Sequence, residues 1–149
     1  MQKTLSENRR ARFDYEIQDH YEAGIELTGQ EVKSVKTGHG NLSGAYAILR
    51  GGEIFLINCQ IPPYQPNNTP KEYDPSRTRR LLLKKEEIRE LTGKLKEKRL
   101  SLIALSFFLK KNLVKVDLGL GRSRKKSDKR ELLKKRDVQR EIDRDVSEK

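Results

Sequence analysis

The chain has 149 residues, with 33 lysines and arginines against 22 aspartates and glutamates, so its formal net charge is +11 at pH 7. An excess of this size indicates a polyanionic partner, either nucleic acid or an acidic membrane surface. No apolar run reaches the ~18 residues that span a bilayer, and the N-terminal residues lack the apolar stretch of a signal peptide. Because the lone Cys59 cannot form an internal disulfide, we expect a cytoplasmic protein with no membrane partner.

The first part of the chain is predicted to form short β-strands. Within residues 12–18, aromatic and aliphatic residues alternate with polar ones, which is the period of a half-buried strand. Residues 21–27 predict a second short strand, in which Gly24 indicates a bulge. Two apolar runs within residues 45–61 flank a Gly-Gly pair, and this pattern predicts a hairpin.

Two helices and one long loop separate these strands from the rest. Residues 29–38 begin and end with glycine, and two valines three positions apart favour one or two helical turns. All five prolines fall within residues 62–76, so this segment is predicted to be a surface loop. Residues 84–99 predict an amphipathic helix, because isoleucine and leucine recur there at helical spacing.

The remaining pattern is again that of strands. Residues 79–83 predict one strand, and residues 100–120 predict a hairpin that turns at Lys111-Asn112. Several short strands with only two or three short helices indicate a mainly β protein that forms a small antiparallel barrel. We therefore predict one folded domain over residues 1–120.

Residues 121–149 form a basic C-terminal tail with 12 basic and 7 acidic residues. The tail has too few apolar residues to offset the entropy of ordering it, so we expect it to be disordered when free. Asp128 and Glu131 have the spacing of a capping box, which predicts a helix that forms when a polyanionic groove supplies contacts. A floppy basic extension that only raises nonspecific affinity is the alternative.

No catalytic or metal-binding pattern is present in the sequence. His20 and His39 lie near neither each other nor Cys59 at a metal-ligand spacing. The glycines around residues 38–40 and 119–121 lack the rest of a phosphate-binding fingerprint. We therefore expect that the protein is not an enzyme and that it has no metal site and no cofactor.

The first of two basic clusters in the body is "NRRARFDY", where three arginines flank Phe13. Guanidinium groups pair with phosphates and an aromatic ring stacks on an exposed base, so Arg9, Arg10, Arg12 and Phe13 are candidate RNA-binding residues. In the other interpretation Phe13 belongs to the barrel core and the arginines are simply solvated.

The second cluster is "PSRTRRLLL". If this segment is a strand, Arg77 and Arg79 lie on one face, where they could grip an RNA backbone. The same pair on an edge strand could equally keep the protein soluble.

The chain closely resembles the SsrA-binding protein (SmpB) family, the bacterial partner of transfer-messenger RNA. The similarity is carried by ordered blocks that include "NRRARFDYEI", "YEAGIELTGQEVKS", "GNLSGAYA", "GEIFLINCQIPPY", "DPSRTRRLLLKKEEI" and "DKRE". The resemblance implies an OB-like barrel that binds the tRNA-like domain of transfer-messenger RNA. It also implies a tail that becomes helical in the empty messenger channel of a stalled 70S ribosome, near the decoding centre of the small subunit.

The resemblance also assigns roles to single residues. Asn8, Glu22 and Leu83 match family positions linked to RNA binding. The tail residues expected at the ribosome are Arg124, Lys125, Lys126, Asp128, Lys129 and Arg130. Phe13, Tyr73 and Ser127 stand where the family often has histidine.

Two other functions are compatible with the composition. A general RNA-binding or ribosome-assembly factor with a nonspecific basic tail would bind unrelated RNAs with similar affinity. A nuclease is a more distant alternative, because the sequence offers no metal or acid–base constellation.

Overall fold

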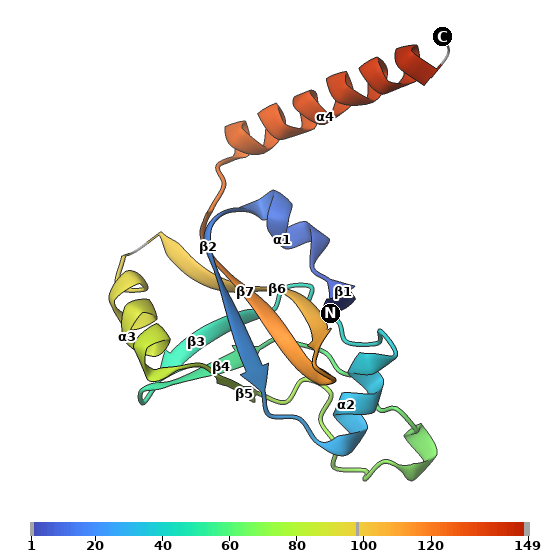
Figure 1. Cartoon of the computed structure of the whole chain (residues 1–149), viewed down its shortest axis with the longest axis vertical. Coiled ribbons are helices and arrows are strands. Elements are labelled where there is room, and N and C mark those ends of the chain that lie inside the picture. Colours follow the sequence, from blue (N-terminus) through green and yellow to red (C-terminus); the bar gives the residue numbers. More distant parts are fainter. Residues whose placement is uncertain (1, 98, 148–149) are drawn as a thin grey trace.

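Antiparallel strands carry the fold in the computed structural model, which describes residues 2–97 and 99–147 (Figure 1). The strands are β1 (Gln2–Glu7), β2 (Tyr15–Ile25), β3 (Tyr46–Arg50), β4 (Glu53–Ile57), β5 (Arg79–Leu82), β6 (Leu100–Lys110) and β7 (Leu113–Ser123). The helices are α1 (Arg9–Asp14), α2 (Gly29–Lys36), α3 (Lys85–Lys94) and α4 (Lys126–Ser147), with a 3-10 turn at Pro66–Asn68. Within the described residues, no helix is long and apolar enough to cross a bilayer.

The strands pair in the order β1-β6-β3-β4-β5-β2-β7, and β6 pairs with β7 as well. Six strands therefore close into a ring of antiparallel pairs. β1 is not part of the ring and pairs with the C-terminal half of β6, at residues 106–110. The interior is filled by aliphatic side chains from the strands and by Phe107. Figure 1 shows α4 leaving the barrel at one end, while α2 and the proline-rich loop lie at the opposite end.

Both predicted hairpins are confirmed. β3 and β4 turn at Gly51 and Gly52, which have φ angles of +59° and +78°. β6 and β7 turn at Lys111 and Asn112, with φ angles of +50° and +66°. A two-residue hairpin needs positive φ at these positions, and glycine and asparagine adopt it at the lowest cost.

The prediction of a strand through Phe13 is wrong, because residues 9–14 form α1. The Asn8 side chain accepts a hydrogen bond from the Ala11 N–H at 3.2 Å and so caps the first turn. From Tyr15 the chain continues as one long strand, whose register shift lies between Ile17 and Asp19. The strand predicted at residues 21–27 is present to Ile25, but as part of β2, and the bulge predicted at Gly24 is wrong because Gly24 pairs in register with Lys115.

Two glycines of β7 allow close contacts with the neighbouring strands β2 and β6. A Cβ atom at Gly121 would overlap the carbonyl oxygen of Glu16, and one at Gly119 would lie 2.7 Å from a Leu105 methyl group. The glycines that lacked a phosphate-loop context in the sequence thus serve the packing of the barrel. Because β7 runs to Ser123, the predicted division between residues 120 and 121 falls inside this strand.

We predict that Gly121→Ala lowers the free energy of unfolding by about 1–3 kcal/mol, because the Glu16 backbone has to move. Urea denaturation measures the change. Gly93→Ala is the matched control, since a Cβ there meets nothing within 4 Å and alanine favours the helix by up to ~1 kcal/mol. Equal free energies of unfolding for Gly121→Ala and Gly93→Ala would contradict the close contact between Gly121 and Glu16.

Candidate nucleic-acid interface

Helix α1 presents a cluster of arginines to solvent. Arg9, Arg10 and Arg12 are all exposed. Arg10 pairs with Asp14 at 3.3 Å, whereas Arg9 and Arg12 have no ion-pair partner within the part of the chain that the structure describes. Two exposed guanidinium groups are therefore present on α1, and a contact of these groups with phosphates stays a prediction.

Phe13 lies where α1 meets the tail. Its ring is half-buried, and three cations stand over it: Arg10 at 5.6 Å, Lys129 at 5.9 Å and Arg136 at 5.7 Å from the centroid. Phe13 lies outside the main core, and neither interpretation of the sequence included these cations; base stacking by Phe13 stays a prediction. Its ring joins α1 to the first turns of α4.

Asp14 anchors the base of the tail. Its backbone carbonyl accepts a hydrogen bond from the Arg124 N–H at 2.8 Å, and its carboxylate lies 3.1 Å from Lys129 Nζ. Burial acts to raise the pKa of Asp14, but Lys129 and Arg10 outweigh it and hold that pKa below its ordinary value. The carboxylate thus stays ionised and keeps α4 beside α1.

The helix of the tail starts earlier than the capping box predicted. α4 begins at Lys126, and the Asp128 carboxylate accepts a hydrogen bond from the Lys125 N–H at 3.3 Å. Asp128 therefore lies in the first turn of α4, where its carboxylate binds the backbone N–H of Lys125, the residue before the helix. Asp128 is not itself the N-cap residue. Lys125, Asp128 and Arg130 are exposed, and Arg124 and Lys129 are half-buried. The side chain of Lys126 lies outside the described residues.

We predict that Phe13→Leu loosens α4, because each cation–π contact at such a site stabilises by about 0.5–1 kcal/mol. Backbone amides of the first turns of α4 should then show lower NMR order parameters. Tyr64→Leu is the control, since it removes a similar contact, with Lys33 at 6.0 Å, elsewhere on the molecule. Unchanged order parameters in Phe13→Leu would show that the Phe13 ring does not hold α4 to α1.

The three positions carried over from the family have different environments. Asn8 is buried, and its Nδ2 donates to the carbonyls of Leu42 at 2.8 Å and Ala104 at 3.0 Å. Glu22 is exposed on β2 and pairs with Lys110 Nζ at 3.0 Å. Leu83 is half-buried against the core, next to the β2–β5 pairing. Asn8 therefore acts on the backbone, whereas Glu22 has its side chain at the surface, in an ion pair with Lys110.

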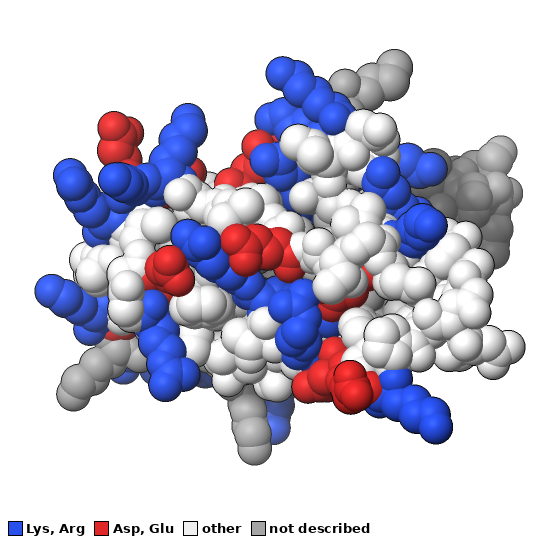
Figure 2. Space-filling model, turned by 90° about the horizontal axis from the view of Figure 1, so that it is seen from below, with Lys and Arg blue, Asp and Glu red and all other residues white. Residues whose placement is uncertain are grey.

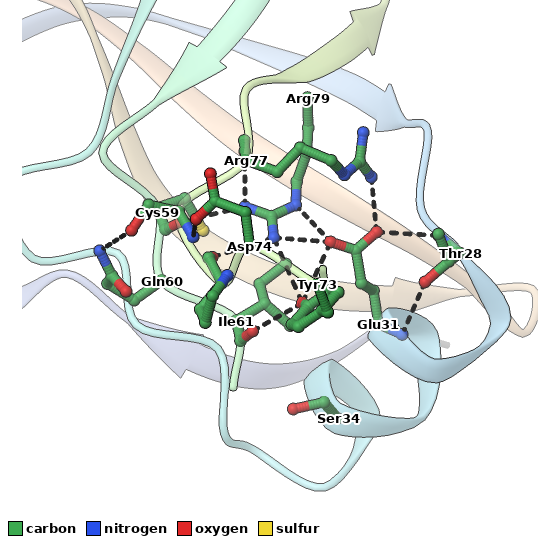
Figure 3. A network of polar contacts seen from close by, with 12 residues as sticks. Thr28, Glu31, Ser34, Cys59, Gln60, Ile61, Tyr73, Asp74, Arg77 and Arg79 are labelled. Atoms are coloured by element: carbon green, nitrogen blue, oxygen red, sulfur yellow. Dashed lines mark hydrogen bonds and ion pairs between the residues drawn. The ribbon is translucent and has the colours of Figure 1, made fainter. Parts of the chain in front are cut away.

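Arg79 does not face RNA, and the interpretation of Arg77 and Arg79 as an exposed pair has to be revised. Arg79 is 0% exposed, and its Nε donates to Glu31 Oε2 at 2.8 Å (Figure 3). The rest of its guanidinium donates to the backbone carbonyls of Cys59 at 3.0 Å, Arg77 at 2.8 Å and Pro75 at 3.0 Å. Arg77 lies at the surface, 41% exposed, and reaches Glu31 Oε1 at 2.5 Å.

Glu31 is the centre of this network. It is 1% exposed and also accepts the Thr28 N–H at 2.9 Å within a capping box at the start of α2. Burial acts to raise the pKa of Glu31, but the Thr28 N–H and the two guanidinium groups outweigh it, so the pKa is lowered. Tyr73 adds a hydrogen bond to the Ile61 carbonyl at 2.7 Å. The network ties α2, the proline-rich loop and β5 together.

We predict that Glu31→Gln lowers the free energy of unfolding by about 3–5 kcal/mol, because Arg79 is left buried without its counter-charge. Arg77→Gln should cost less than ~1 kcal/mol, because this partner is at the surface. Denaturant unfolding of both variants provides the comparison.

The contribution of Glu31 also depends on pH. Its pKa in the folded state lies below the ordinary value of 4.5, so its stabilisation is complete above 4.5 and is lost as the pH falls through the lowered folded-state pKa. The difference between wild type and Glu31→Gln should therefore shrink in acid. A difference that stays constant would show that the charge of Glu31 is not what stabilises the fold.

The remaining titratable candidates show no catalytic arrangement. His20 lies 3.1 Å from Asp117, and His39 lies 3.0 Å from the Thr37 hydroxyl. Burial raises the pKa of the Cys59 thiol to about 11, so the thiol stays protonated. Among the described residues, no group of three His, Cys, Asp or Glu side chains could hold a metal ion.

The cations are spread unevenly over the surface. On the face in Figure 2, which is the end away from α4, lysines and arginines project mainly from the rim, with acidic side chains between them and an uncharged area to one side. This face has no continuous cationic field. The unpaired arginines of α1 and the tail therefore remain the strongest candidate interface.

Comparisons with known proteins agree with this description. The family model described as "SmpB protein" matches residues 5–148. The SsrA-binding protein of Synechococcus elongatus is 50% identical over 144 residues, which cover 97% of this chain and 94% of the relative. That of Thermosynechococcus vestitus is 48% identical over 147 residues, which cover 99% and 97%. A solved chain described as "tmRNA-SmpB: a journey to the center of the bacterial ribosome" matches with a TM-score of 0.67 and 45% identity, covering 80% of this chain and 84% of that chain.

Fold, charge and similarity together place this chain in a class of basic RNA-binding proteins built on an antiparallel sheet. The chain belongs to the SmpB family.

Proposed function

We propose that this protein binds the tRNA-like domain of transfer-messenger RNA and delivers it to stalled ribosomes for trans-translation, in the cytoplasm and without enzymatic activity of its own. The names of its relatives, SsrA-binding proteins, and the ribosome named for its structural neighbour support this proposal. One observation of the molecule carries it. The exposed arginines of α1 adjoin the base of the tail, so a body that holds RNA and a tail that enters the ribosome meet at one joint.

In this proposal the ring-closed sheet is an OB-like barrel, spanning the predicted domain at residues 1–120, and the tail acts separately. Proteins with such barrels hold RNA through surface cations and hydrogen bonds while the closed sheet stays rigid. The buried Glu31–Arg79 pair and the Asn8 hydrogen bonds support this rigidity. Arg9, Arg10, Arg12 and Glu22 are the body residues that face the RNA.

The tail is proposed to fold fully only in the empty messenger channel. Leu133 and Val138 are 48% and 55% exposed on α4, so this part of the helix packs against no core. An isolated helix of this kind is marginal in water, and it gains stability where phosphates neutralise its cations. Lys125, Lys129 and Arg130 are the cations expected to meet ribosomal RNA, and Asp128 stabilises the first turn.

We predict that the double variant Lys125→Gln/Arg130→Gln separates the two steps. Its affinity for the tRNA-like domain should change less than about threefold, whereas peptide tagging on stalled ribosomes should fall by more than about tenfold. Filter binding at physiological salt, with ordinary tRNA as competitor, and a tagging assay measure the two effects. Lys33→Gln/Lys36→Gln, which removes two charges from α2, is the matched control.

Two outcomes would contradict this division of roles. If both double variants lose affinity alike and ordinary tRNA competes equally, the protein is a general RNA-binding factor with an electrostatic tail. If tagging is unaffected by the tail variant, these cations do not meet the ribosome.

A further inference from the structure

A groove of about 680 Å³ opens beside α1, where β3 and β6 separate. β3 pairs with β6 only at Tyr46 and Ala47, opposite Ile103 and Leu102. Beyond these pairs the two strands part, and the end of α3 lies across the opening with Leu95 among the lining residues. A volume of this size is typical of clefts that take a small ligand or a single chemical group.

The lining combines an apolar floor with aromatic walls and a cationic rim. Leu102 and Ile103 are buried in the floor. Tyr46, which is 38% exposed, and the half-buried Tyr15 supply aromatic rings. The rim carries the exposed side chain of Arg10 from α1 and that of Lys96, which follows α3.

We propose that this groove takes one unpaired nucleobase of the bound RNA, stacked against Tyr46, with its phosphates between Arg10 and Lys96. This inference rests on the proposed function and adds a second mode of contact to the phosphate contacts of α1. Sequence-specific RNA recognition uses unstacked bases placed on aromatic side chains and next to cations.

The polar groups of the lining favour a base over an apolar protein side chain. Thr92 and Ser101 line the groove, and a hydroxyl oxygen can accept a hydrogen bond from the amino group of a base edge. An apolar side chain would displace water from these hydroxyl groups and offer them no hydrogen bond in return, which is unfavourable. The rim cations also match a polyanion, and the groove is continuous with the arginines of α1 through Arg10.

The test uses the tRNA-like domain of transfer-messenger RNA with 2-aminopurine placed at each unpaired position in turn. The full-length protein should quench the fluorescence of one position by stacking, and Tyr46→Leu should remove this quench and weaken binding roughly tenfold. Tyr46→Phe, which keeps a stacking face, should restore both. Tyr64→Leu is the matched control, because Tyr64 is 40% exposed but does not line the groove.

The outcomes distinguish this inference from the proposed function. If the RNA binds but no position is quenched, or if Tyr46→Leu behaves like wild type, the groove holds no base, although the proposed function stands. If Tyr46→Leu weakens only ribosome binding, the occupant of the groove belongs to the ribosome and not to the tRNA-like domain, and the inference is overturned. If the tRNA-like domain does not bind at all, a short unstructured oligonucleotide with 2-aminopurine replaces it. Quenching of that probe, lost in Tyr46→Leu, supports the groove, and its absence overturns it.

Discussion

The buried amide of Asn8 is the constraint on which the candidate interface depends. Its Oδ1 accepts the Ala11 N–H, and its Nδ2 donates to the carbonyls of Leu42 and Ala104, which belong to two distant parts of the chain. The backbone N–H of Asn8 also donates to the Leu105 carbonyl at 2.7 Å. A buried amide with its donors and acceptor satisfied has one orientation, so the position and direction of α1 are set by this residue.

Everything proposed about RNA follows from where α1 lies. Arg9 and Arg12 point their charges outward from it, Arg10 forms part of the groove rim, and Asp14 holds the first residues of the tail. In the proposed function, Asn8 therefore influences RNA binding without touching RNA, through the helix that it begins. Arg79 acts in a similar way at the other end of the barrel, where it donates to the Pro75 carbonyl of the proline-rich loop and to the Cys59 and Arg77 carbonyls on either side of that loop.

The sequence predicted the parts of the fold that depend on local pattern. Hairpins at Gly51-Gly52 and Lys111-Asn112 follow from turn chemistry alone, and the helical turns of α2 follow from its bracketing glycines and the spacing of its two valines, whereas its cap at Thr28 was not predicted. α1 was missed because the alternation at residues 12–18 continues the period of β2, while the capping role of Asn8 depends on carbonyls far away in sequence. β1 was missed because its residues are polar and mostly exposed, so it has no alternation to detect.

The candidate site was predictable only as far as charge is visible in composition. The arginines of α1 and the basic tail stand out in the sequence, and the structure places them together. The burial of Arg79 was not predictable, because "PSRTRRLLL" gives no sign that Glu31 lies beside it. The groove was also invisible, since it exists only where β3 and β6 part under α1. Non-local pairings of this kind leave no period in the sequence.

The molecule separates strong interactions from weak ones in a way that suits the proposed two-step role. The barrel is held by a closed set of strand pairs and by a fully buried ion pair, so its surface changes little on binding. The joint of the tail consists of cation–π contacts and ion pairs at half-exposed side chains, each contributing about 0.5–1 kcal/mol at most. Phosphates that compete for Lys129 and Arg136 replace these contacts with charge-assisted ones of equal or greater strength. In the proposed function, RNA therefore detaches the tail from α1 without disturbing the barrel, and the same exchange uncovers Phe13 beside the arginines of α1.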